Sequence, residues 1–117
     1  MAQSIRYYDE VLTQSARNYA YTGDPNWEAR YWAADPELGK IINEAISVGD
    51  DTEREFFANV ERANNALIAM EYQSIDLVHE GRRADAIRIL DSEAYSNNKA
   101  IFRQGLESYL ATRGEER

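Results

Sequence analysis

The chain has 117 residues, enough for one domain with a single core, and its 44% hydrophobic and 29% charged residues are typical of a folded protein. Its net charge of -8, from 21 acidic and 13 basic residues, repels phosphate backbones, so we expect no nucleic-acid partner. The absence of cysteine excludes disulfides, thiolate metal sites and a cysteine nucleophile.

Membrane insertion and secretion signals are not expected within the chain. No apolar run approaches the ~18 residues that span a bilayer, and the first residues, MAQSIRYYDE, lack the apolar stretch of a signal peptide. We therefore expect a soluble chain. Both ends lie inside helical patterns and no capping residue precedes the first, as expected for a piece of a longer protein.

The first predicted helix ends at Thr22 and Gly23. Its apolar stripe has helical spacing and consists of Ile5, Leu12, Ala16 and Tyr19. Asp24-Pro25 then combines an N-cap with proline at the first helical position, so a second helix should begin there. Because a residue before proline disfavours helical geometry, we expect a short helix that stops before Pro36.

Aromatic residues are unusually dense in this short segment. Trp27 and Tyr31 are four residues apart, so they share one helical face and should pack inward. We expect the segment to fold back as a lid over the open end of a helix bundle.

Three more apolar patterns follow along the chain. One runs to Gly49 and consists of Leu38, Ile41, Ile42, Ala45 and Ile46. The next begins near Asp50 and Asp51, continues to Gly81 over about 45 Å, and consists of Phe56, Val60, Ala63, Leu67, Met70 and Leu77. The last consists of Ala86, Ile87, Leu90, Ile101, Gly105, Leu106 and Tyr109, with a bend at Asp91-Ser92, where Ser92 can cap a new start.

These patterns predict an all-α fold. No stretch alternates with the period of a β-strand, and no internal repeat is visible. We expect one domain over residues 1–117: an up-down four-helix bundle with a short extra helix after the first long helix. An even number of passes places both termini at the same end.

Catalytic and metal-binding patterns are missing. A di-iron carboxylate bundle needs two Glu-x-x-His units, but the chain has a single histidine, His79, which as an imidazolium would favour the C-terminal end of its helix. HEGRR lacks the second histidine of a zinc protease, and no phosphate-binding loop or nucleophile elbow is present. We expect no enzyme activity, no catalytic residue, no metal and no cofactor.

Polar residues interrupt the apolar stripes. Asp9, Asn64, Glu71 and Asn98 occupy stripe positions, and burying each without a partner would cost about 1–3 kcal/mol. One interpretation is a polar layer that fixes helix register. The other is a small-molecule pocket between helices. Its predicted ligand-binding residues are Asp9, Arg17, Trp27, Arg30, Tyr31, Asn64, Glu71, Tyr95 and Lys99.

Several motifs in order resemble one bacterial sensor family. They are DEVLTQSAR (9–17), TGDPNWEARY (22–31), PELGKIINEA (36–45), ANNALIAMEYQSIDLVHEG (63–81) and ADAIRILDSEAYSNNKAIFRQG (84–105). Over roughly residues 5 to 110 the chain is similar to the helical extracytoplasmic input domains of diguanylate cyclases, cyclic-di-GMP phosphodiesterases, histidine kinases and chemoreceptors.

The resemblance implies a periplasmic domain of an inner-membrane signalling protein. Such a domain lies between two membrane helices that are not in this chain, acts as a homodimer in the full-length protein, and passes a ligand-induced displacement to an output domain. The alternatives are a helical protein-interaction or dimerisation module without a small ligand, and a cytoplasmic bundle that shares only the pattern.

Overall fold

The computed structural model describes residues 2–113. The side chains of residues 2, 3, 56 and 110–113 lie outside the description, and so does the predicted core position of Phe56. The described chain is all-helical, without a strand. Its elements are α1 (Ala2–Thr22), α2 (Pro25–Val48), α3 (Asp51–His79), α4 (Arg83–Leu90) and α5 (Glu93–Arg113). The all-α prediction is confirmed.

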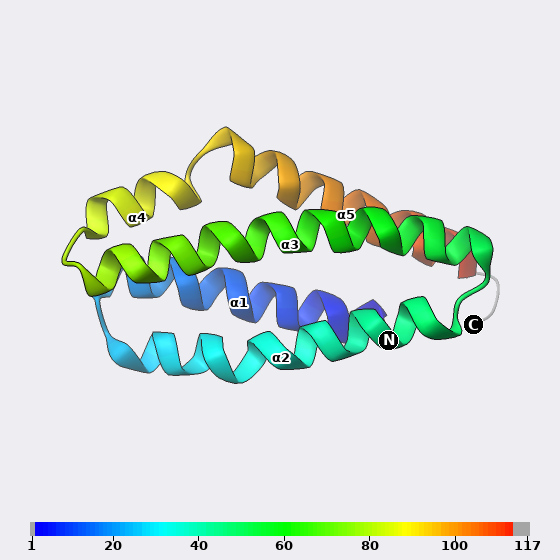
Figure 1. Cartoon of the computed structure of the whole chain (residues 1–117), viewed down its shortest axis with the longest axis horizontal. Coiled ribbons are helices and arrows are strands. Elements are labelled where there is room, and N and C mark those ends of the chain that lie inside the picture. Colours follow the sequence, from blue (N-terminus) through cyan, green and yellow to red (C-terminus); the bar gives the residue numbers. More distant parts are fainter. Residues whose placement is uncertain (1, 114–117) are drawn as a thin grey trace.

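The helices lie along the long axis of a molecule that measures 47 × 26 × 20 Å (Figure 1). α1 packs mainly on α2, whereas α3 packs on α5 and α4 and also touches α1 and α2. α3 therefore connects the two halves. The start of α1 and the end of α5 lie toward the same end of the molecule (Figure 1).

The predicted short extra helix is wrong, because α2 continues through Pro36 to Val48. The buried residues of α2 keep helical spacing across the proline: Tyr31, Ala34, Leu38, Ile42 and Ala45. Breaking the helix would take half of that stripe off the core. Packing therefore outweighs the roughly 3 kcal/mol that proline costs inside a helix. The predicted lid is also wrong, since its residues form the first turns of α2 alongside α1.

The turns follow the local signals. Gly23 and Gly81 have φ of +71° and +77°, the left-handed region that glycine tolerates best. After α3, the Arg82 N–H donates to the Leu77 carbonyl at 2.8 Å and the Gly81 N–H to the Val78 carbonyl at 3.0 Å. These two bonds form a Schellman motif, which ends α3.

The interruption between α4 and α5 lies where the sequence indicated. The Ser92 Oγ accepts a hydrogen bond from the Tyr95 N–H at 3.2 Å, so Ser92 acts as an N-cap for α5. The bend at Asp91-Ser92 is therefore confirmed.

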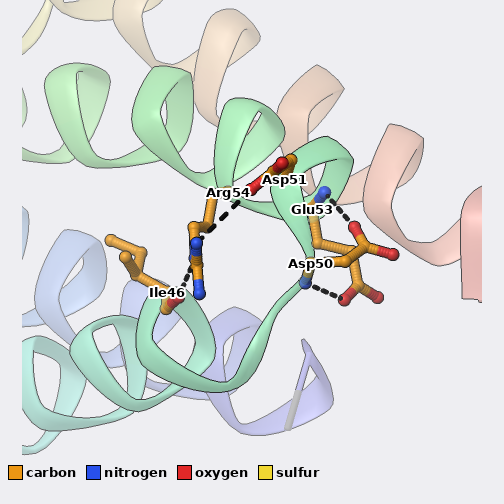
Figure 2. A network of polar contacts seen from close by, with 5 residues as sticks. All are labelled: Ile46, Asp50, Asp51, Glu53 and Arg54. Atoms are coloured by element: carbon orange, nitrogen blue, oxygen red, sulfur yellow. Dashed lines mark hydrogen bonds and ion pairs between the residues drawn. The ribbon is translucent and has the colours of Figure 1, made fainter.

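The start of α3 carries the most complete cap (Figure 2). Asp50 Oδ1 accepts from the Glu53 N–H at 2.9 Å, and Glu53 Oε1 accepts from the Asp50 N–H at 3.1 Å. This is a capping box. Arg54 Nε also donates to the Ile46 carbonyl at the end of α2, at 3.3 Å, which ties the two helices together.

The core combines apolar side chains from all five helices. Tyr31 is fully buried, whereas Trp27 is only partly buried and packs at the edge. The largest buried apolar side chains are Tyr31, Phe57, Phe102, Ile5, Leu12, Leu38, Leu67, Ile75 and Val60. In the part of the chain that the structure describes, no helix combines the length and apolar character needed to cross a membrane.

Candidate functional site

A buried carboxylate joins three helices of the core. Glu71 of α3 is 2% exposed. Tyr31 of α2 donates its hydroxyl to Glu71 Oε1 at 2.9 Å, and Tyr95 of α5 donates to Oε2 at 2.6 Å. Both carboxylate oxygens therefore have a donor, and three helices are joined at one side chain.

A second polar contact connects α1 with α5. Lys99 Nζ lies 2.6 Å from Asp9 Oδ2 and donates to Thr13 Oγ1 at 2.8 Å. Only 14% of the Lys99 side chain and 11% of the Asp9 side chain are exposed. With Glu71 and its two tyrosines, this pair brings polar residues from all four long helices into one region.

Burial sets the protonation of these carboxyl groups. It raises the pKa of Glu71 from its ordinary value of 4.5 to about 7, although the hydroxyls of Tyr95 and Tyr31 favour the ionised form. The pKa of Asp9 is also raised, since burial outweighs the neighbouring Lys99 charge. The pKa values of Tyr31 and Tyr95 are raised by burial and by the Glu71 charge.

Two adjacent cavities lie between α1 and the α4–α5 pass and share Lys99 and Arg103 as lining residues. The first, of about 240 Å³, is lined by Arg6, Asp9, Glu10, Lys99, Phe102, Arg103, Leu106 and Glu107. The second, of about 410 Å³, is lined by Thr13, Arg17, Leu90, Asp91, Ser92, Tyr95, Ser96, Lys99, Ala100 and Arg103. We call the two together the α1–α5 groove.

The groove exists because α1 and α5 are bridged by long side chains rather than by close backbone packing. Lys99 spans it to reach Asp9, and Arg17 Nη1 reaches Asp91 Oδ1, before α5, at 2.8 Å. Arg17 Nη2 also donates to the Leu90 carbonyl at 3.1 Å. Polar side-chain contacts therefore connect α1 with α5, whereas α1 packs closely on α2 and α5 packs closely on α3.

The predicted pocket residues divide into four groups, of which the last, Trp27 and Arg30, lies apart. Five lie together in the buried polar region: Asp9, Tyr31, Glu71, Tyr95 and Lys99. Arg17 lines the second cavity. Asn64 is buried two turns before Glu71 and lines neither cavity.

Trp27 and Arg30 do not join the groove. The Arg30 guanidinium lies 5.6 Å from the centre of the Trp27 ring, so the two form a cation–π contact near the surface of α2. The structure places both outside the two cavities of the groove.

The sequence reasoning missed Thr13, Arg103 and Arg6, although a signal was available. Asp9, Thr13 and Arg17 are spaced by four, and so are Tyr95, Lys99 and Arg103. Residues four apart share a helical face, so each set forms a polar row along its helix. The two rows face each other across the groove.

His79, expected to favour the end of its helix, lies in the last turn of α3. Its Nε2 lies 2.9 Å from Glu28 Oε1, and Trp32 Nε1 donates to Glu28 Oε2 at 2.9 Å. Burial alone would raise the pKa of Glu28, but the hydrogen bonds from His79 and Trp32 lower it. Among the described residues, no group of histidine and acidic side chains is arranged to hold a metal ion.

Comparison with family models, curated proteins and solved structures finds no match to this chain. The functional conclusion therefore depends on the residues of the chain and their geometry.

Proposed function

We propose that the chain is a sensory input domain of a membrane-bound signal-transduction protein, located in the periplasm. The observation that carries this proposal is the α1–α5 groove, which lies between the first and last helices and is bridged by two ion pairs. A ligand or partner that entered the groove would act directly on the two helices whose free ends lie together.

We propose the up-down four-helix bundle as the finer description of the fold. Its passes are α1, α2, α3 and the last pass formed by α4 and α5 together, interrupted at Ser92. In such a bundle, α1 and the last pass are neighbours. α1 packs on the α4 part of that pass but not closely on α5, so we place the change in spacing between α1 and α5.

Signalling would then be a population shift between two spacings of α1 and α5. A ligand shifts that equilibrium only by the difference in its affinity for the two states. The domain would work without chemistry of its own, with no cofactor, and as part of a homodimer anchored by membrane helices outside this chain. An output domain would read the displacement.

A chimera tests the proposal without knowing the ligand. The whole chain would replace the input domain of a membrane-bound histidine kinase that drives a fluorescent reporter. Removing both buried charges, with Asp9→Leu and Lys99→Met together, avoids leaving one of them unpaired. We expect this double variant to shift the basal reporter output, because one of the two ion-pair bridges across the groove is gone.

A matched control removes an exposed pair within one helix, with Glu37→Leu and Lys40→Met on α2, whose charged atoms are 3.5 Å apart. This control should leave the output unchanged. If both double variants behave like the parent chimera, while immunoblots show equal amounts of protein, signalling through the groove is excluded.

A protein-interaction or dimerisation module is the second candidate, and exposed aromatic residues favour it. Trp32 and Tyr72 are 41% and 38% exposed, and their ring centres are 5.1 Å apart on α2 and α3. Tryptophan and tyrosine are enriched at protein interfaces. Concentration-dependent association in sedimentation equilibrium that Trp32→Gln abolishes would favour this module over ligand sensing.

A further inference from the structure

We propose that the α1–α5 groove binds a small organic carboxylate, held by Arg17, Lys99 and Arg103 in the larger cavity. This inference rests on the sensory function proposed above and names the chemical class of its ligand. Three observations support it: the charge of the cavity, its unused hydrogen-bond donors, and the carboxylates that its cations contact now.

The charge of the larger cavity is opposite to that of the chain. Three basic side chains line it, Arg17, Lys99 and Arg103, with Asp91 as the one acidic residue in its lining. The chain as a whole has a net charge of -8. Cations gathered in a concave site of an acidic protein raise the local concentration of anions.

The smaller cavity differs in charge, although it shares Lys99 and Arg103. Its lining adds one base, Arg6, and balances the cations with Asp9, Glu10 and Glu107. An anion is therefore favoured in the larger cavity and not in the smaller one.

Donors in the larger cavity outnumber their partners. A lysine ammonium has three N–H groups, and Lys99 uses two, on Asp9 and Thr13. An arginine has five, and Arg17 uses two, on Asp91 and Leu90. Within residues 2–113, Arg103 forms neither a hydrogen bond nor an ion pair, and it attracts Asp9 only at long range. A ligand for this cavity must therefore bring acceptors.

The present partners of these cations indicate a carboxylate. Lys99 and Arg17 already hold carboxylates, those of Asp9 and Asp91, at 2.6 and 2.8 Å. A ligand carboxylate can reproduce the same charge-assisted contacts. The cavity volume of about 410 Å³ exceeds what an inorganic anion fills, so a carbon skeleton has room beside Tyr95 and Ala100.

The location of the ligand also defines its effect. A carboxylate in this cavity contacts Arg17 on α1 and Lys99 and Arg103 on α5, so it would bridge the two helices. It would also compete with Asp9 for Lys99 and with Asp91 for Arg17. Binding would therefore replace contacts within the protein by contacts through the ligand and change the α1–α5 spacing.

Isothermal titration calorimetry on the whole chain tests the assignment. The probes are acetate, succinate and citrate, with sulfate as the inorganic anion and putrescine as the cation, all at one ionic strength. We expect saturable binding of at least one carboxylate, and weaker or no binding of sulfate and putrescine.

Arg103→Gln is the diagnostic variant, since Arg103 has no bonded partner to lose and the fold should be unaffected. Losing one charge-assisted hydrogen bond should weaken carboxylate binding by about tenfold or more. Arg30→Gln, which removes an arginine outside the groove, is the matched control and should bind as the parent does.

Three results would overturn the carboxylate assignment. They are no saturable binding by any of the three carboxylates, tighter binding of sulfate or putrescine than of every carboxylate, and carboxylate binding that Arg103→Gln leaves unchanged. None of them decides the sensory function, because the chimera reports on signalling through Asp9 and Lys99 without a ligand. A reporter that responds while carboxylates fail would reject only the ligand class.

Discussion

At the scale of single residues, Glu71 matters for the pH dependence of stability, because its carboxylate loses hydration when it is ionised in the core. The carboxylate is 2% exposed, and its tyrosine donors offset only part of the burial cost, so its pKa is about 7. The unfolded chain releases this proton near 4.5, its ordinary value. Between these two values the folded protein holds a proton that the unfolded chain has lost.

Stability should therefore fall as the pH rises through this interval. The contribution of Glu71 is fully favourable below about pH 4.5 and is lost by about pH 7 to 8, a change of about 3 kcal/mol in the free energy of unfolding. Glu71→Gln should remove this dependence, because its amide can accept from one tyrosine and donate to the other. Urea denaturation at several pH values, with parent and variant equal near pH 4.5 and the variant more stable at pH 8, would confirm it.

Two variants check that the effect belongs to this site. Glu44→Gln, an exposed substitution on α2, should keep the pH profile of the parent. Tyr95→Phe removes the donor at 2.6 Å from the ionised carboxylate, so the pKa of Glu71 should rise further. The loss of stability should still begin near pH 4.5 but continue to a higher pH than in the parent. A Glu71→Gln profile as steep as that of the parent would rule out Glu71 as its cause.

At the scale of secondary structure, the junction between α2 and α3 is held by one side chain with two roles. Asp50 caps α3 through the Glu53 N–H and places a negative charge at the positive end of the helix (Figure 2). Asp50→Ala should lower the free energy of unfolding by about 1 kcal/mol, or the Tm by roughly 4 °C. Differential scanning calorimetry measures the change.

Asp51→Ala provides the comparison, since it removes the same charge from the same turn. Asp51 contacts Arg54 at 3.4 Å on the surface but does not cap the helix. Its loss should cost less than half as much. Equal losses for the two variants would show that charge alone, and not the capping box, matters at this junction.

Pro36 tests how packing overrides a local rule within α2. The proline has no N–H to donate to the Trp32 carbonyl, yet the helix continues. Pro36→Ala restores that bond but makes the unfolded chain more flexible, an opposing effect of about 0.4–1 kcal/mol. We expect a net stabilisation of about 1–2 kcal/mol by urea denaturation. A loss of stability would mean that the proline fixes a geometry that the core needs.

The elements that could be predicted from sequence are those whose signals are local. The N-caps at Asp24 and Ser92 and the left-handed Gly23 and Gly81 act on neighbouring backbone, so reading a few residues was enough. The helix end predicted at Pro36 was wrong because the core contacts of α2 outweigh the local effect of proline, and a rule based on neighbouring residues does not take those contacts into account.

The candidate site could be predicted in part for the same reason. Buried Asp9 and Glu71 stood out because they interrupt apolar stripes. Arg103 did not, since it lies on an exposed face of α5, and only the packing of the helices shows that it lines a cavity together with residues of α1. Trp27 and Arg30 were included for their chemistry, but no sequence rule placed them in the same cavity as Lys99.

At the scale of the whole molecule, the charge is unevenly distributed. Basic side chains outnumber acidic ones in the larger cavity of the α1–α5 groove, while the junction of α2 and α3 carries Asp50, Asp51, Glu53 and Glu55. Self-repulsion among surface acids opposes folding, and salt screens it over a Debye length of about 10 Å at 0.1 M. A buried carboxylate responds little to salt, because its cost comes from lost hydration.

Salt therefore separates the two sources of pH dependence. Both surface repulsion and Glu71 ionisation lower stability as the pH rises from 5 to 8. At pH 8, raising NaCl from about 0.01 to 0.5 M should stabilise the parent by about 1 kcal/mol, a few degrees in Tm, because the net charge is -8. At pH 5 the gain should be smaller. The pH dependence that remains at high salt should be much smaller in Glu71→Gln, where only the raised pKa of Asp9 is left to contribute, whereas the salt gain at pH 8 should persist in that variant. Calorimetry of both proteins at two pH values and two salt concentrations tests this, and a salt gain lost together with Glu71 would contradict the separation.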